Sequence, residues 1–303
     1  MTETIVVVGV PTALGGHLSG MERTPTGLRA GGVLERIRDR PGLAGVRIID
    51  VGDVVIEPGF VEDPDPRAKN RSRIAEFLPR ERDLVAAALA DAGPGARPLI
   101  LGGDCTAHAG ALAGLRRHRP DARLAIAWFD AHGDYNTSDT TPSGNVWGMP
   151  LAMICGLGDA DLVGACDGPT VDSRHAALIG GQVLDETEAR MLAVTGVAHF
   201  GAGMIASPAG LAALAAWATT VAHDVDALYV AVDLDVLDAA GNWAVQMPEP
   251  DGLSLDTAVA AVDTLARSVP IAGFGATAVN LANGDVPATV DAVARLAEAA
   301  LKR

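Results

Sequence analysis

The stretch "WFDAHGDYNT", residues 128–137, sets acidic and imidazole side chains at alternating positions after a short apolar run. Asp130, His132 and Asp134 follow "LAIAW" directly. In an extended strand, side chains two residues apart share a face, so we expect these three groups to point into one pocket. Carboxylates combined with an imidazole are typical ligands of a divalent ion such as Mn²⁺. The pattern therefore predicts a metal site.

Two further apolar runs end in residues of the same kind. "LILGGDCTAH" contributes Cys105, and "YVAVDLDVLD" contributes Asp233 and Asp235. A single acidic residue after a strand is more often a helix cap or part of a turn. Three such strand ends in one chain favour a shared site, because carboxylates buried together without a cation repel one another strongly. Shared carboxylates can also bridge two ions. The candidate metal ligands are Cys105, Asp130, His132, Asp134, Asp233 and Asp235.

Alternating strand-like and helix-like stretches are expected to position these groups. Eight apolar runs predict strands at 4–10, 46–52, 97–104, 123–134, 176–181, 197–203, 227–238 and 271–280. Amphipathic stretches predict helices at 26–39, 80–93, 211–223, 254–268 and 285–303, with Ser254 and Asp285 as N-caps. Continuous rather than alternating apolar runs indicate strands covered on both faces, as in a parallel sheet. The sequence thus predicts one layered α/β domain over 1–303, with its ligand site beyond the carboxyl ends of the strands.

Composition restricts the class of partner. The 303 residues carry a net charge of −15, whereas nucleic-acid binders need a basic face. The start, "MTETIVVVGVPTALGG", has no basic segment before its apolar run, and no run approaches the ~18 apolar residues of a membrane span. We therefore expect a cytoplasmic protein with a small-molecule substrate, with neither nucleic acid nor membrane as partner. The three cysteines predict free thiols, and the glycines of "GVPTALGG" lack the spacing of a dinucleotide site.

At this point the sequence resembles the ureohydrolase family of arginases, agmatinases and hydroxyarginine amidinohydrolases. "GGDC" resembles its GGDH motif, "DAHGD" its DAHxD motif and "DLDVLD" its DxDxxDP motif. "NTSDTTPSGNVWGMP" resembles the arginase loop that holds an α-amino acid, and the resemblance extends over nearly the whole chain. It implies a three-layer arginase-like fold, with a central, mostly parallel sheet of about eight strands between helices, and a trimeric or hexameric assembly.

The resemblance also implies roles for individual residues. Asp130 and Asp233 would bridge two Mn²⁺ ions, and a hydroxide between ions ~3.5–4 Å apart would attack a guanidino carbon. Cys105 and Asp134 would complete the first ion's shell, while His132 and Asp235 would bind the second. Asp130, Asp233 and His132 would form the catalytic set. The implied substrate-binding residues are Asn136, Thr141, Ser143, Asn145 and Trp147.

The metal site departs from the family pattern at Cys105, which stands where the family has a histidine ligand. A thiolate is soft and Mn²⁺ is hard, so this position leaves one or two bound ions possible, or a softer ion in the first site. Cys105 is either a ligand or a small buried hydrophobe. His108, three residues on, either substitutes as a ligand or packs in the core.

The substrate-binding part of the sequence departs from the family pattern at three places. Trp147 replaces a histidine proton shuttle, and such groups contribute roughly 10²–10⁴-fold to rates. Ala278, in "GATAVN", replaces the glutamate that grips the guanidinium, and losing one partner of a buried charge pair costs about 2–5 kcal/mol. The segment 199–208 shows no aspartate for the substrate's amino group.

Two hypotheses follow. The first is a metal-dependent hydrolase of a C–N bond in a linear amidine or modified guanidino compound, such as a hydroxylated arginine. Efficient hydrolysis of plain arginine is not expected. The alternative is a catalytically impaired homologue that binds metal or ligand without hydrolysis.

Overall fold

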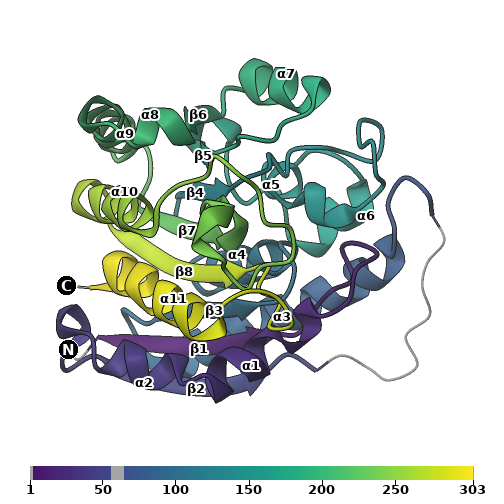
Figure 1. Ribbon diagram of the computed structural model, residues 1–303. Helices are drawn as coiled ribbons and strands as arrows, with labels where there is room; N and C mark the ends of the chain where they lie inside the picture. The colour runs from purple at the N-terminus through teal and green to yellow at the C-terminus, as the bar shows by residue number, and fades with distance from the viewer. Residues whose placement is uncertain (1–2, 56–64, 303) are drawn as a thin grey trace.

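One parallel sheet forms the centre of the molecule (Figure 1). The computed structural model describes residues 3–55 and 65–302. Within them, eight strands run in the order β2-β1-β3-β8-β7-β4-β5-β6, and every neighbouring pair is parallel. The strands are β1 (Thr4–Val10), β2 (Arg47–Asp53), β3 (Arg97–Gly102), β4 (Leu124–Asp130), β5 (Ala176–Gly180), β6 (Ala198–Gly201), β7 (Ala227–Asp233) and β8 (Ile271–Thr277).

Helices cover both faces of this sheet, which makes three layers. One face packs against α1 (Thr24–Ala30), α2 (Val33–Arg38), α8 (Ala202–Ile205), α9 (Pro208–Val221), α10 (Leu255–Ser268) and α11 (Val286–Leu301). The other packs against α3 (Arg71–Ala92), α4 (Ala107–His118), α5 (Pro150–Ile154), α6 (Ala160–Ala165) and α7 (Glu186–Thr195). The predicted fold, a mostly parallel sheet of about eight strands between helices, is confirmed.

The apolar runs are continuous because most strands are buried on both sides. In β1, Ile5 and Val7 belong to the apolar cluster on one face, whereas Val6 and Val8 belong to the cluster on the other. Successive strand side chains point to opposite faces, so a strand between two helical layers needs apolar residues at every position. β2 is the exception, as its residues are exposed or half-buried at the edge of the sheet.

Two helix predictions differ from the structure. The stretch 26–39 forms two helices, because Gly32 has a left-handed φ of 81° between α1 and α2. The stretch 80–93 belongs to a longer helix that starts at Arg71 and contains Pro79. Residues before Pro79 stay helical because Ile74, Phe77 and Leu78 are buried against the sheet and α4. The predicted N-caps are confirmed, since the side chains of Ser254 and Asp285 accept hydrogen bonds from the first turns of α10 and α11.

The strands that lead to the candidate site end earlier than predicted. β4 ends at Asp130 rather than at 134, and β7 ends at Asp233 rather than at 238. Asp134 lies in a left-handed conformation with φ of 49°. The strand alternation from which we expected residues 130, 132 and 134 to converge is therefore wrong, and a turn beyond the sheet brings them to the pocket instead. None of the described helices combines the length and hydropathy needed to cross a bilayer.

Candidate metal and substrate site

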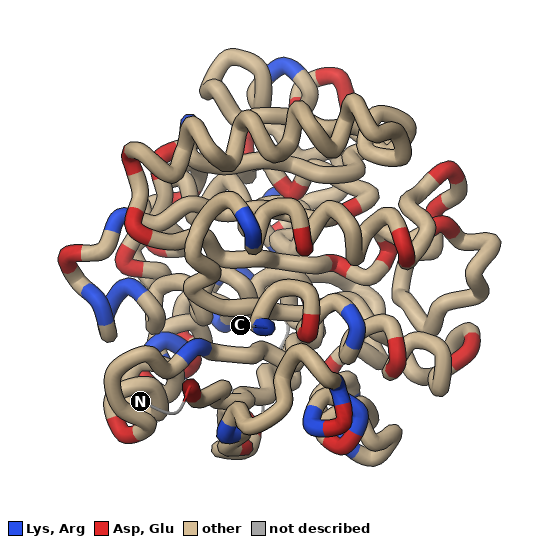
Figure 2. Tube along the Cα trace, turned by 90° about the vertical axis from the view of Figure 1, so that its left-hand side faces the viewer, with Lys and Arg blue, Asp and Glu red and all other residues tan. Residues whose placement is uncertain are grey.

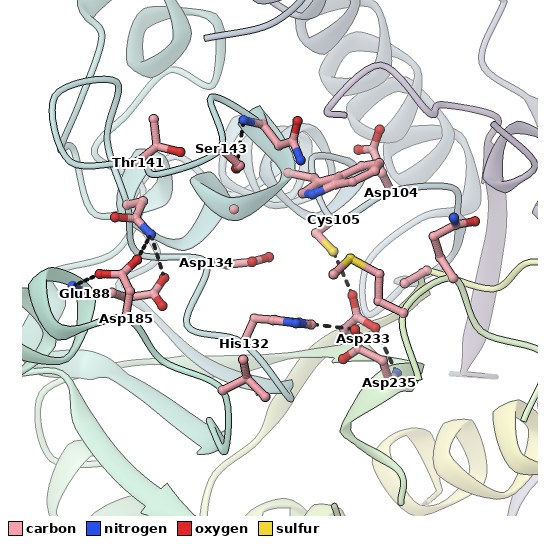
Figure 3. Close-up of a pocket in the computed structure, with 18 of the residues that line it drawn as sticks. Asp104, Cys105, His132, Asp134, Thr141, Ser143, Asp185, Glu188, Asp233 and Asp235 are labelled. Carbon is pink, nitrogen blue, oxygen red and sulfur yellow. Dashed lines mark hydrogen bonds and ion pairs between the residues drawn. The ribbon is translucent and has the colours of Figure 1, made fainter. Parts of the chain in front are cut away.

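The carboxyl ends of β3, β4, β7 and β8 and the loops that follow them surround a pocket of about 280 Å³ (Figure 3). These strands are neighbours at the centre of the sheet, so residues far apart in sequence meet at one edge. The candidate ligands that line the pocket are Cys105, His132, Asp134, Asp233 and Asp235, and Asp130 lies directly against them.

Two groups of potential metal ligands share one carboxylate. Cys105, Asp130 and Asp233 offer ligand atoms within 4.8 Å of one another, and Asp130, His132 and Asp235 do the same. The Cys105 thiol donates a hydrogen bond to Asp233 Oδ2 at 2.8 Å, and His132 Nδ1 lies 3.2 Å from Asp235 Oδ2. Asp130 is thus placed where a single carboxylate can serve two adjacent cations.

Backbone and indole groups hold these carboxylates in place. Asp130 accepts from the His132 backbone N–H at 2.7 Å and from Trp128 Nε1 at 2.9 Å. Asp235 accepts from the Ala131 N–H at 3.1 Å, which ties the end of β7 to the end of β4. Such contacts fix ligand orientation before any cation arrives.

The electrostatics of the cluster favour a cation. Burial raises the pKa of Asp130 to about 6, and the charge of Asp235 adds to the shift. Burial and neighbouring carboxylates likewise raise the pKa values of Asp233 and Asp134. Burial lowers the pKa of His132, but its hydrogen bonds to Asp130 and Asp235 outweigh that and raise it. A divalent ion would relieve this mutual repulsion.

Two buried polar atoms support the same fit. Asp134 Oδ2 has no hydrogen-bond partner among the described residues, although it is shielded from solvent, and His132 Nε2 has only an ion-pair contact with Glu249 Oε1 at 3.7 Å. Buried polar atoms are almost always paired, so an unpaired carboxylate oxygen beside the cluster suits a cation or its bound water. Asp134 lines the pocket but belongs to neither of the two groups above. The donor set therefore fits divalent ions, with the thiol of Cys105 as its one soft member.

Cys105 reaches the pocket from the turn between β3 and α4. The preceding Gly103 allows this turn, because a Cβ there would lie 1.8 Å from the Thr12 carbonyl oxygen. Asp104 anchors the turn by accepting from the N–H groups of Gly15 and Thr106. Burial, followed by the charge of Asp233, raises the pKa of the Cys105 thiol well above its ordinary value.

His108 packs in the core, which was one of its two predicted roles, and it is not a ligand in the pocket. Its Nδ1 lies 3.3 Å from Tyr229 Oη and its Nε2 lies 3.1 Å from Thr277 Oγ1. The ring stands edge-on to Trp128, and burial lowers its pKa to about 3. Both ring nitrogens face these hydroxyls, and the residue does not line the pocket.

The five predicted substrate-binding residues all line the same pocket: Asn136, Thr141, Ser143, Asn145 and Trp147. Lys69, which the sequence analysis missed, donates to Asn145 Oδ1 at 3.0 Å. An ammonium group can only donate, so it faces the amide oxygen and leaves the Asn145 amino group to donate elsewhere. Trp147 packs its ring over Gly16, where a Cβ would lie 2.2 Å from ring atoms.

Two acidic residues that the sequence analysis did not identify also line the pocket. Asp185 and Glu188 follow β5, and Asn136 Nδ2 donates to Asp185 Oδ2 at 2.9 Å. Burial raises the pKa of Glu188 to about 7, although the hydrogen bond that its carboxylate accepts from the Tyr135 N–H acts to lower it. The segment 199–208, which has no acidic residue, includes the end of β6 at the sheet edge, whereas Asp185 and Glu188 follow β5, which adjoins β4. The signal was present in "IGGQVLDETE", where acidic residues follow a fourth strand end.

Ala278 lies in the pocket wall directly after β8. It is buried and has a left-handed φ of 59°. Its N–H donates to the Gly103 carbonyl at 2.7 Å, and its carbonyl accepts from the Gln246 N–H at 2.8 Å. These two hydrogen bonds hold Ala278 in a backbone conformation that alanine rarely adopts. The wall here carries a methyl group, with Gln246 and Met247 beside it.

The fold and the pocket define an α/β protein with a candidate two-ion centre at the carboxyl ends of its strands. The model of the arginase family matches residues 3–302. The chain belongs to the arginase family, whose members are metal-dependent hydrolases of C–N bonds in guanidino and amidino groups.

Individual relatives agree with this assignment. The chain is 32% identical over 268 residues to an arginase of Bacillus caldovelox, covering 87% of this chain and 86% of that protein. It is 30% identical over 256 residues to an arginase of Bacillus subtilis, covering 84% and 82%. The solved structure of the Bacillus caldovelox arginase superposes with a TM-score of 0.89 at 29% identity, over 100% of this chain and 99% of that one.

Proposed function

We propose that this protein hydrolyses a C–N bond of a modified guanidino compound with a free amino-acid end, such as N-hydroxyarginine. One observation carries the proposal: two ligand groups that share Asp130 lie in a pocket whose wall has Ala278 in place of the family's guanidinium-binding glutamate. An unmodified guanidinium is fully cationic and would lack its carboxylate partner there. A hydroxyguanidine is less basic and depends less on that partner.

The proposed ligand sets follow the resemblance. Cys105, Asp134, Asp130 and Asp233 would hold one Mn²⁺ ion, and His132 and Asp235 would hold a second together with Asp130 and Asp233. The short Cys105–Asp233 contact and the unpaired Asp134 oxygen support this assignment. Divalent ions in such sites lower the pKa of bound water towards neutrality and stabilise developing negative charge.

The chain's own residues would orient the substrate. The Asn145 amino group, backed by Lys69, suits the substrate carboxylate, and Ser143 lies in the same loop. Asp185, which also accepts from Asn136, suits the α-ammonium group. With its amino-acid end held between these groups, the substrate's guanidino end would lie towards Cys105 and Ala278. The water oxygen would bond to the guanidino carbon, and the bond from this carbon to the side-chain nitrogen would break. A proton from the water would pass to that nitrogen, so that N-hydroxyarginine gives ornithine and hydroxyurea.

Product analysis tests this proposal. Purified protein with Mn²⁺ is incubated with arginine, N-hydroxyarginine, agmatine and N-methylarginine, and released urea or substituted urea is measured with ornithine or its analogue. We expect hydroxyurea and ornithine in equal amounts from N-hydroxyarginine, and none from an Asp233→Asn variant. If no compound in the panel is cleaved while the protein holds two ions, the proposed activity is wrong.

The alternative is a homologue that binds metal or ligand without hydrolysis. The thiol at position 105 and Trp147 at the proton-shuttle position favour it, because both replace a family histidine. Metal content and turnover measured on the same sample separate the two. One ion or none per chain, with ligand binding but no product, supports the binding protein.

Assembly and location remain proposals as well. By its family resemblance we propose a cytoplasmic homo-oligomer, a trimer or hexamer. Light scattering coupled to gel filtration measures the mass directly, and a monomer at micromolar concentration would refute this part.

A further inference from the structure

The wall beside Ala278 contains a side-chain amide whose orientation is set by its neighbours. Val245 forms an antiparallel bridge with Val279, and the Gln246 N–H donates to the Ala278 carbonyl at 2.8 Å. Gln246 therefore lies beside Ala278, and both line the pocket. Its side chain is half-buried.

A chain of hydrogen bonds decides which end of the Gln246 amide is free. The Ala282 N–H, which can only donate, binds Asn280 Oδ1 at 3.0 Å. Asn280 must then present its amino group to Gln246, and Asn280 Nδ2 donates to Gln246 Oε1 at 2.7 Å. With its oxygen occupied in this way, Gln246 has its amino group left to donate.

Compared with the family pattern, this part of the pocket wall presents a hydrogen-bond donor, the Gln246 amino group, in place of an acceptor, the glutamate carboxylate. The family glutamate would offer carboxylate oxygens to guanidinium N–H groups, whereas Ala278 offers none and Gln246 offers N–H groups. A guanidinium carries donors and no acceptor, so it cannot satisfy the Gln246 amino group. An oxygen on the terminal nitrogen can, because a hydroxyl oxygen accepts.

We propose that Gln246 is a specificity-determining residue that donates a hydrogen bond to an oxygen atom on the terminal nitrogen of the substrate. Asn280 is its positioning residue. The inference rests on the proposed function and narrows its substrate class to guanidino compounds oxygenated at the terminal nitrogen. A site built to bind a substrate hydroxyl discriminates strongly against the analogue that lacks it.

Binding measurements test this independently of turnover. Dissociation constants of N-hydroxyarginine and arginine are measured by calorimetry on the metal-free protein, in which no cleavage is expected, and on two variants, Gln246→Leu and Gln246→Glu. We expect the unmodified protein to favour N-hydroxyarginine, and Gln246→Leu to reduce that preference about tenfold, the effect of one hydrogen bond. Gln246→Glu should reverse the preference, because a carboxylate attracts the guanidinium and repels the oxygen.

A second variant covers the case in which position 246 does not tolerate change. Asn280→Leu should weaken the same preference, because Gln246 can then turn its amide, and thermal melting monitors folding. An unchanged preference in every folded variant, or none in the unmodified protein, overturns the inference. Cleavage of N-hydroxyarginine would then still support the proposed function. Selective binding without cleavage would refute the proposed function and retain this inference.

Discussion

At the scale of single residues, the site is defined by acidic groups that are costly to bury together. Asp130, Asp233 and Asp235 are all less than a tenth exposed and lie at the ends of two neighbouring strands. The Cys105 thiol donates to one of them, which partly offsets the repulsion without a cation. In the proposed site, position 105 would therefore decide how strongly the first ion is held.

Replacing this thiol by imidazole tests that statement. Cys105→His is expected to raise the Mn²⁺ that survives gel filtration in metal-free buffer from about one ion to two per chain, because a neutral imidazole suits Mn²⁺ better than a thiol that must first lose its proton. In excess Mn²⁺, both the variant and the unmodified chain should hold two ions. Elemental analysis after gel filtration gives the count, and Cys105→Ser is the matched control, which should bind no more than the unmodified chain. Two ions in the unmodified chain after gel filtration would show that the thiol does not impair the site.

Another buried acidic residue, Glu81, lies outside the pocket. Glu81 on α3 is fully buried, and neither of its carboxylate oxygens has a hydrogen-bond partner among the described residues. Burial, with the charge of Asp104, raises its pKa well above the ordinary value. A carboxyl group with a raised folded-state pKa stabilises the fold below its unfolded pKa, and loses that contribution as pH rises through the folded value.

Glu81→Gln should therefore stabilise the protein at high pH. The variant's melting temperature is expected to exceed that of the unmodified protein at pH 8 and to approach it at pH 5, since the amide never ionises. Scanning calorimetry at both pH values measures the difference. A difference that does not change with pH would mean that the carboxyl group is already compensated in the folded state.

At the scale of elements, the apolar runs were enough to predict where the strands lie. They were not enough to predict where β4 and β7 end, because contacts with other segments fix those ends. The body of β4 is apolar throughout, so its place in a parallel sheet follows from the sequence. The turn at 131–134 depends on the Ala131 contact with Asp235, a residue 104 positions away.

Asp185 is the N-cap of α7 and Glu188 lies in its first turn, and both were missed because only the pairing of β4 with β5 brings the start of this helix to the pocket. Lys69 was missed because a long-range contact places it: its backbone N–H donates to the Gly144 carbonyl at 2.9 Å, next to Asn145.

The close approach of Gly103 to Thr12, in the turn after β3, leads to a prediction about replacing this glycine. Gly103→Ala should destabilise the fold by about 1–3 kcal/mol, the usual cost of overpacking, because its Cβ would meet backbone atoms of Thr12. Gly164→Ala, in the exposed part of α6 with nothing within 4 Å, should instead stabilise it by about 0.5–1 kcal/mol. Chemical denaturation measures both, and equal effects would show that the close approach to Thr12 does not constrain the turn.

At the scale of the whole molecule, the net charge of −15 is spread over many helices and loops rather than gathered on one face (Figure 2). The buried acids of the candidate site lie at the ends of β4 and β7. An ion bound there would link two central strands and should stabilise the entire fold.

Metal linkage can be measured by melting. Mn²⁺ at 100 times its dissociation constant is expected to stabilise the folded state by about 2.7 kcal/mol. Asp233→Asn should abolish most of this shift, whereas Asp256→Asn, at an exposed position in the first turn of α10, should not affect it. Equal stabilisation of both variants would place the ion outside the proposed site.

The central claim is that this pocket cleaves an oxygenated guanidine in preference to a plain one. The most direct measurement is the ratio of kcat/KM for N-hydroxyarginine to that for arginine, determined on one Mn²⁺-loaded preparation. We expect a ratio of at least about ten, the effect of one hydrogen bond gained at the reacting group. A ratio of one or below, with efficient release of urea from arginine, would contradict the account.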